Sequence, residues 1–170
     1  TANLNYLSGV IYSRTGLGKT TLLGTMPGRG IVLDVPQVEG GTIVLADQVP
    51  RIKVFKVTRW EMYEEIRAYL AHEKHGFSWF AIDSLTAAQE LAKRKTMRER
   101  SLAEDPHVIS QQDWGKIGQL MADLVFTFCL LPMHRLFTAQ ERLYSDGETG
   151  TSVLQPAVSP SALASLLPPM

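Results

Sequence analysis

The sequence predicts an α/β fold, a mostly parallel sheet with helices on both faces. Short apolar runs alternate with segments whose apolar residues recur at helical spacing, which is typical of strand–helix–strand units. A glycine-rich loop at residues 13–20 separates the first apolar run from the first helical segment, and another apolar run ends in Asp83. The strands are predicted over residues 6–12, 30–35, 52–57, 77–82 and 134–139.

Helix-start patterns justify the helices between these strands. Thr58 with Glu61, and Ser110 with Asp113, have capping-box spacing, so we expect helices to begin at these points. The second of these helices carries a long apolar stripe that begins at Trp114 and is predicted to face the core. The other helices are predicted over residues 19–26 and 85–100, and the Pro- and Ser-rich residues 156–169 are expected to be loosely held.

Composition bounds the class of protein. The chain has 170 residues, enough for a single domain over residues 1–170, and truncation of a longer parent chain after Met170 is left open. Its 17 basic and 17 acidic residues give a net charge of zero, which removes the simplest argument for nucleic-acid binding. One cysteine fits a reducing cytoplasm, and no stretch is apolar enough to span a membrane.

The glycine-rich loop has the form of a phosphate-binding loop. It reads Ser-Arg-Thr-Gly-Leu-Gly-Lys-Thr and lies between a predicted strand and a predicted helix, as this motif requires. Lys19 is expected to contact the outer phosphates and Thr20 to ligate Mg²⁺. Ser13 replaces the first glycine of the pattern, and a glycine-rich turn without function is the alternative. The expected nucleotide contacts are Ser13, Arg14, Thr15, Gly16, Leu17, Gly18, Lys19, Thr20 and Thr21.

Asp83 ends a strand that is apolar on both faces, which is the form of a Walker B strand. Ligands of such sheets bind at the carboxyl ends of the strands, so Asp83 is expected to hold Mg²⁺ opposite Thr20. The alternative is an aspartate that only ends the strand in a turn.

These residues resemble those of the RecA-like ATPases, and more closely the phage-encoded RecA-like proteins that accompany single-strand annealing recombination. The resemblance covers nearly the whole chain. It rests on the phosphate loop and on LD at 33–34, EGG at 39–41, IDS at 82–84, QDWGK at 112–116, FTAQER at 137–142 and QPAVSP at 155–160.

The resemblance implies an ATP hydrolase with a RecA-like P-loop sheet, ATP and Mg²⁺ as cofactors, and a bacterial host cytoplasm as its location. Glu39 matches the glutamate that polarises the attacking water, with Asp34 as the alternative because residues 36–38 look like an insertion. Gln140 matches the residue that senses the terminal phosphate. Lys19, Glu39 and Gln140 are therefore the candidate catalytic residues.

The resemblance also implies partners. Single-stranded DNA is expected at the stretches 101–109 and 143–158, and the basic cluster before the first of them suggests Lys95, Arg98 and Arg100 as phosphate contacts. A solvated helix end is the alternative reading of this cluster. We also expect a homo-oligomer with ATP near a subunit interface, and a single-strand annealing or single-strand-binding protein as partner. A nucleotide-dependent scaffold or switch with weak turnover is the competing function.

Overall fold

The fold is a parallel sheet enclosed between two layers of helices, as the sequence predicts. The computed structural model describes residues 6–36, 41–48, 50–100, 108–145 and 150–166. Its strands are β1 (Ser8–Ser13), β2 (Gly30–Asp34), β3 (Ile52–Lys56), β4 (Trp79–Asp83), β5 (His134–Ser145) and β6 (Ser152–Pro156). Its helices are α1 (Lys19–Leu23), the 3-10 helix η1 (Gly41–Gln48), α2 (Met62–His72), α3 (Leu85–Arg98), α4 (Gln111–Cys129) and α5 (Pro160–Leu166).

The strand order places the ends of four sequence-distant segments at one edge of the sheet. The order is β1-β5-β4-β2-β3, with all of these neighbours parallel. In this register Asp34 lies opposite both Asp83 and Lys56, and Ser13 lies opposite Gln140. The carboxyl ends of the strands therefore meet along one edge.

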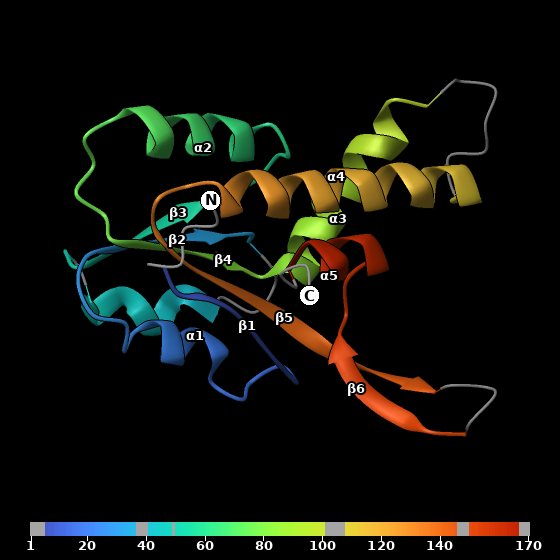
Figure 1. Cartoon of the computed structure of the whole chain (residues 1–170), viewed down its shortest axis with the longest axis horizontal. Coiled ribbons are helices and arrows are strands. Elements are labelled where there is room, and N and C mark those ends of the chain that lie inside the picture. Colours follow the sequence, from blue (N-terminus) through green and yellow to red (C-terminus); the bar gives the residue numbers. More distant parts are fainter. Residues whose placement is uncertain (1–5, 37–40, 49, 101–107, 146–149, 167–170) are drawn as a thin grey trace.

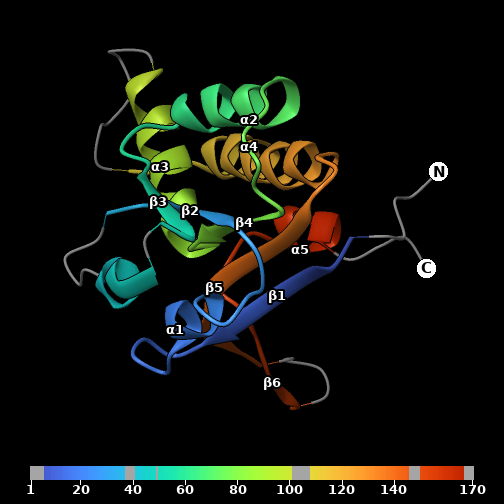
Figure 2. The ribbon, with the colours of Figure 1, turned by 90° about the vertical axis from the view of Figure 1, so that its left-hand side faces the viewer.

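Alternation along the buried strands divides the core into two clusters. Phe80 and Ile82 of β4 pack against the α2–α4 layer, whereas Trp79 and Ala81 pack with Leu23 of α1 on the opposite face. Figures 1 and 2 show α2, α3 and α4 over one face and α1 over the other. Helices on both faces are thus confirmed.

The start of α2 differs from the prediction. Its N-cap is Glu61, without a side-chain cap, and the helix begins at Met62. Thr58 instead directs its hydroxyl and backbone N–H toward the Met62 sulfur, because residues 59–63 first form a turn. The capping box of Ser110 and Asp113 at the start of α4 is confirmed.

Two further expectations about packing are wrong. Trp114 lies in the first turn of α4 with 47% of its surface exposed, because the buried stripe of this helix begins only at Ile117. Residues 156–166 are held rather than loose: Val158 and Ala162 are buried, and the Ser161 hydroxyl donates to the Gly118 carbonyl at 2.9 Å. Residues 167–169 lie outside the described residues.

The strand β5 extends beyond the predicted residue 139 into an antiparallel ribbon with β6. The pairing runs from Glu141 opposite Pro156 to Ser145 opposite Ser152. Figure 1 shows this ribbon projecting away from the helices. The described part of the stretch 143–158, where single-stranded DNA is expected, therefore belongs to a hairpin.

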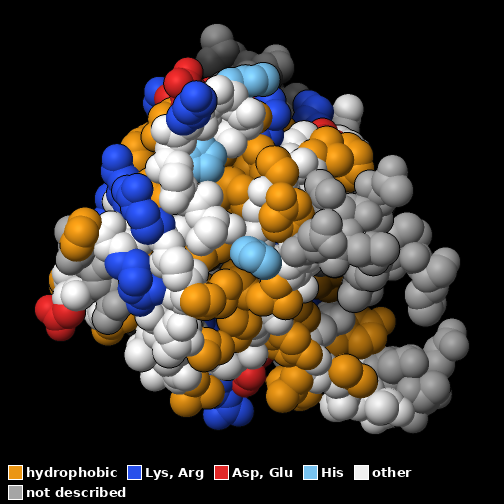
Figure 3. Space-filling model, turned by 60° about the vertical axis from the view of Figure 1, so that its left-hand side comes forward, with side chains coloured by type: hydrophobic (Ala, Val, Ile, Leu, Met, Phe, Trp, Pro, Cys, Tyr) orange, Lys and Arg blue, Asp and Glu red, His pale blue; other side chains and the backbone are white. Residues whose placement is uncertain are grey.

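The described surface mixes charged and apolar side chains. Figure 3 shows one face on which hydrophobic side chains occupy the middle and lower parts, while Lys and Arg side chains lie mainly toward one margin. No helix among the described residues is long and apolar enough to cross a membrane.

The contact between β2 and β4 generates a stability prediction. A Cβ added at Gly30 would lie 2.1 Å from the ring of Trp79, which is fully buried. Gly30→Ala should therefore lower the free energy of unfolding by about 1–3 kcal/mol through overpacking. Gly9→Ala is the matched control, since its Cβ would meet Leu136 at an ordinary 3.5 Å. Thermal unfolding compares the two, and equal melting temperatures would contradict the close packing at Gly30.

Candidate functional site

The phosphate loop connects β1 to α1 through backbone conformations that favour glycine. Gly16 and Gly18 have φ angles of 83° and 81°, in the left-handed region that L side chains rarely adopt. Gly18 is also the N-cap of α1, so the loop delivers the chain directly into the first helical turn. Gly16 and Gly18 therefore provide the left-handed backbone conformations that the turn of the phosphate loop requires.

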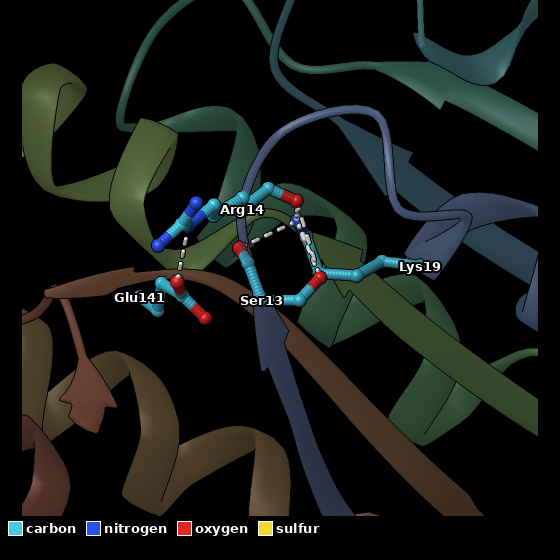
Figure 4. A network of polar contacts seen from close by, with 4 residues as sticks. All are labelled: Ser13, Arg14, Lys19 and Glu141. Atoms are coloured by element: carbon cyan, nitrogen blue, oxygen red, sulfur yellow. Dashed lines mark hydrogen bonds and ion pairs between the residues drawn. The ribbon is translucent and has the colours of Figure 1, made fainter.

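Lys19 is held by oxygens of its own loop. Its Nζ donates to the Ser13 carbonyl at 2.9 Å, to the Ser13 hydroxyl at 3.2 Å and to the Arg14 carbonyl at 2.8 Å (Figure 4). Partial burial lowers the pKa of Lys19, against the opposing effect of the Asp83 and Glu141 carboxylates. Ser13, which replaces a glycine of the pattern, therefore supplies a further acceptor for the lysine.

Asp83 connects the phosphate loop to the centre of the sheet. The Thr20 hydroxyl donates to Asp83 Oδ2 at 2.7 Å, and the buried Thr138 hydroxyl of β5 donates to Asp83 Oδ1. Hydroxyl and carboxylate oxygens are the ligands that Mg²⁺ prefers in proteins. The two residues predicted to hold the metal therefore lie within hydrogen-bond distance of each other.

Asp34 and Lys56 form an ion pair at the same edge, and sequence reasoning did not single out Lys56. Lys56 Nζ and the Thr42 hydroxyl both donate to Asp34 Oδ2, and Lys56 also contacts Thr42 at 2.9 Å. Asp34 is 8% exposed. The signal that could have found Lys56 is its position as the last residue of a strand in register with Asp34.

Gln140 lies between the phosphate loop and the hairpin. Its Nε2 donates to the Thr15 hydroxyl at 3.3 Å, and its backbone N–H donates to the Thr86 hydroxyl at 3.0 Å. The next residue, Glu141, accepts a hydrogen bond from Arg14 Nε at 3.0 Å (Figure 4). Two consecutive residues of β5 thus contact the loop.

These groups line one pocket of about 330 Å³, a volume within the usual range of small-molecule sites. The pocket brings together residues from the loop, from the ends of β2, β3 and β4, and Gln140 from within β5. Its lining residues are Thr15, Gly16, Gly18, Lys19, Thr20, Thr21, Asp34, Val35, Pro36, Val44, Lys56, Asp83, Ser84 and Gln140. Three predicted nucleotide contacts are not among these lining residues. Ser13 accepts a hydrogen bond from Lys19, Arg14 donates one to Glu141, and the Leu17 side chain is 67% exposed. Glu39 lies outside the described residues.

Two of the three predicted DNA contacts, Lys95 and Arg100, form ion pairs with carboxylates of the protein itself. Lys95 donates to Glu99 at 2.6 Å and to Glu61 at 3.2 Å, and these bonds raise its pKa. Arg100 is paired with Asp113, and the two side chains are only 6% and 3% exposed. The Arg100 guanidinium, with help from Ser110, holds the pKa of Asp113 well below its usual range.

The Arg100 side chain is therefore paired with Asp113 at the start of α4, and its role as a phosphate contact stays a prediction. Arg98 is exposed, as is Arg94 one turn earlier. These two arginines are the part of the predicted cluster that faces solvent.

A phosphate loop opening a helix, a hydroxyl–carboxylate pair for a divalent cation and a pocket at the strand ends together define a P-loop nucleotide-binding domain of the ATPase type. The family model described as an AAA domain matches residues 5–167. The chain therefore belongs to this AAA domain family, which implies ATP binding and usually Mg²⁺. No curated protein matches the chain.

Replacing Lys19 tests the pocket directly. Lys19→Ala should weaken ATP binding roughly 10- to 100-fold, because a hydrogen bond from a charged donor contributes about 1.5–3 kcal/mol. The melting temperature should stay close to that of the parent, since the ammonium contacts only the loop. Lys53→Ala removes an exposed lysine outside the pocket and serves as the control. Titration with a fluorescent ATP analogue measures both, and equal affinities would refute the phosphate-loop assignment.

Proposed function

We propose that this chain is a Mg²⁺-dependent ATP hydrolase of the RecA-like kind, which acts in phage DNA recombination by single-strand annealing. The observation that carries the hydrolase assignment is the 2.7 Å contact between the Thr20 hydroxyl and the Asp83 carboxylate beside Lys19. The phage recombination role is supported by the sequence resemblance and by a hairpin that begins directly after Gln140.

The chemistry divides among a few side chains. Lys19 would exchange its contacts with the Ser13 and Arg14 carbonyls for phosphate oxygens of ATP. Thr20 and Asp83 would hold Mg²⁺, which neutralises charge on the outer phosphates when bound. Because Asp83 also accepts from Thr138, its carboxylate is fixed in orientation before the cation arrives.

Phosphoryl transfer to water also needs an acceptor that orients the attacking water. The resemblance assigns this role to Glu39, which lies outside the described residues, and the present proposal gives it to the alternative, Asp34. Asp34 lines the pocket and lies in register with Asp83 on the neighbouring strand. Its place beside the metal ligand suits a group that positions water at the terminal phosphate.

Gln140 couples the pocket to the hairpin in this proposal. An amide that now donates to Thr15 can turn toward a phosphate oxygen, and the Gln140 backbone carbonyl accepts a 2.7 Å hydrogen bond from the Ala157 N–H at the base of the hairpin. Exposed apolar side chains on both strands make the hairpin suited to a contact with a partner: Leu143, Tyr144, Val153 and Leu154.

The partners in this proposal are single-stranded DNA, further copies of the chain with ATP near their interface, and a single-strand annealing or single-strand-binding protein. The bacterial host cytoplasm is the proposed location. Arg94 and Arg98 are the exposed cations available to DNA near the stretch 101–109.

The second candidate is a nucleotide-dependent switch with weak turnover and a protein partner. The observation that favours it is that Lys95 and Arg100 pair with Glu61, Glu99 and Asp113, which leaves less of their charge to attract DNA. ATP turnover measured with and without single-stranded DNA separates the two functions. Stimulation by DNA supports the first, and equal turnover in both conditions supports the second.

Asp83→Asn tests the metal role. The amide keeps the shape and one acceptor oxygen but loses the charge that faces the cation. Apparent Mg²⁺ affinity in the turnover assay should fall roughly 10- to 100-fold, the usual cost when a group that fixes a metal site is changed. ATP binding without Mg²⁺ should change little. Unchanged turnover at limiting Mg²⁺ would count against Asp83 as a metal residue.

The DNA proposal has its own test in salt dependence. Each phosphate contact on a single strand contributes about 0.7 to the slope of log affinity against log salt. The double variant Arg94→Gln/Arg98→Gln should therefore lower the slope by about 1.4 in the presence of ATP. Lys53→Gln/Lys74→Gln, which removes the same charge from other exposed positions, should leave it unchanged. Equal slopes for the two double variants would mean that α3 ends in a solvated basic turn, and the switch function would then lead.

A further inference from the structure

Lys56 is the last residue of β3, the outermost strand of the sheet, yet its ammonium group reaches into the nucleotide pocket. It lines that pocket together with Asp34, Asp83 and Lys19. Its backbone is in register with Asp34, and its side chain, 53% exposed, pairs with the Asp34 carboxylate, 11% exposed. A half-exposed lysine therefore neutralises a buried carboxylate at the edge of the site.

The two oxygens of Asp34 have different surroundings. Oδ2 accepts both from Lys56 Nζ and from the Thr42 hydroxyl, the latter at 2.8 Å. Among the described residues, none donates a hydrogen bond to Oδ1. One oxygen thus anchors the carboxylate, and the other keeps its capacity to accept a proton or a hydrogen bond from water.

The anchor of Asp34, its Oδ2 contacts with Lys56 and Thr42, has an electrostatic reason. Asp34 and Asp83 end neighbouring parallel strands, whose backbones lie about 4.8 Å apart. Carboxylates at the ends of adjacent strands, with the phosphates of ATP nearby, repel one another. The Lys56 ammonium, on the side of Asp34 away from Asp83, offsets this repulsion. Asp83 then keeps its carboxylate for Mg²⁺.

The anchor also joins three segments. Asp34 ends β2, Thr42 belongs to η1, and Lys56 ends β3. The Lys56 Nζ contact with Thr42 at 2.9 Å closes the triangle, so η1 and β3 are fixed to the same carboxylate. Movement of any one of these residues would turn the carboxylate plane of Asp34.

We infer that Lys56 is a positioning residue for ATP hydrolysis: with Thr42 it holds Asp34 by Oδ2, so that Oδ1 orients the water that attacks the terminal phosphate. The inference rests on the proposed hydrolase function and assigns the water-orienting role to Asp34. In the step itself, water oxygen bonds to the terminal phosphorus, the bond to the ADP oxygen breaks, and a water proton passes toward Oδ1.

Steady-state kinetics of Lys56→Gln test the inference. A misplaced acceptor affects the transition state more than the bound substrate, so kcat should fall roughly 10- to 100-fold while KM for ATP changes less than about threefold. Lys53→Gln removes a charge from the same strand without touching Asp34 and should keep the parent values. A raised KM with an unchanged kcat would mean that Lys56 binds phosphate, and would overturn the positioning role.

The Asp34→Asn variant completes a cycle. If Lys56 acts only through Asp34, the double variant Lys56→Gln/Asp34→Asn should be no slower than Asp34→Asn alone. Independent, multiplying losses in the double variant, or full activity in Asp34→Asn, would each overturn the inference.

Thr42 offers a second route that does not alter a charge. Thr42→Val removes the hydroxyl from Oδ2 and should lower kcat, whereas Thr42→Ser keeps the hydroxyl and should retain most of the rate. Equal rates for the two variants would contradict the anchoring of Oδ2. Asp83→Asn distinguishes failure of the inference about Lys56 from failure of the proposed hydrolase function. If Asp83→Asn abolishes turnover while the Lys56 and Thr42 variants stay fully active, the hydrolase function stands and the positioning role of Lys56 is wrong. If the parent itself does not turn over ATP, the proposed function falls first.

Discussion

The hydrogen bond between Thr20 and Asp83 joins two segments that are 63 residues apart in the sequence, and the organisation of the pocket depends on it. It fixes the first turn of α1 to the end of β4, and thereby sets the distance between the phosphate loop and the row of side chains at the strand ends. The parallel register makes the contact possible, because it brings the end of each strand to the same edge. A change of one residue in the β4 register would turn Asp83 to another face.

Along that edge, positive and negative side chains are balanced. Lys19 and Lys56 lie with Asp34 and Asp83 in one pocket, so the site carries no formal excess of either sign from these four groups. Lys19 is available to phosphate because its partners are loop carbonyls and a hydroxyl, which it can exchange. Lys56 is committed to Asp34 and Thr42. The two lysines of one pocket are thus held by different kinds of partner.

The parts of the fold and site that the sequence could predict are those fixed by local spacing. The phosphate loop, the strand that ends in Asp83 and the capping box at Ser110 each depend on a few consecutive residues, and all three lie where they were expected. The helix start at Thr58 was wrong, although its spacing matched, because a turn over residues 59–63 competes with the cap. A local pattern states what a segment can form, and its neighbours decide which form is stable.

The sequence placed Thr20 opposite Asp83 through two recognisable motifs, but it did not predict contacts between distant segments that carry no such motif. Lys56 enters the site only through the register of β3 with β2, which no spacing along the chain specifies. Arg100 looked like one of several surface cations, yet its partner Asp113 approaches from α4 and buries it. Residues 158 and 162 are buried because α5 packs against α4, and the Pro- and Ser-rich composition of that segment does not reveal this. Residue types alone therefore predicted more exposed basic charge at the end of α3 than the structure has. They also predicted a loosely held segment at residues 156–166, which is packed instead.

A structure of the chain with a non-hydrolysable ATP analogue and Mg²⁺ tests most directly whether Lys19, Thr20 and Asp83 form the nucleotide site. We expect Lys19 Nζ on the outer phosphates and a cation held between Thr20 and Asp83. Lys56 should still be bonded to Asp34, with Oδ1 facing a water at the terminal phosphate. An analogue bound elsewhere, with Lys19 still bonded to Ser13 and Arg14, would contradict this assignment of the site.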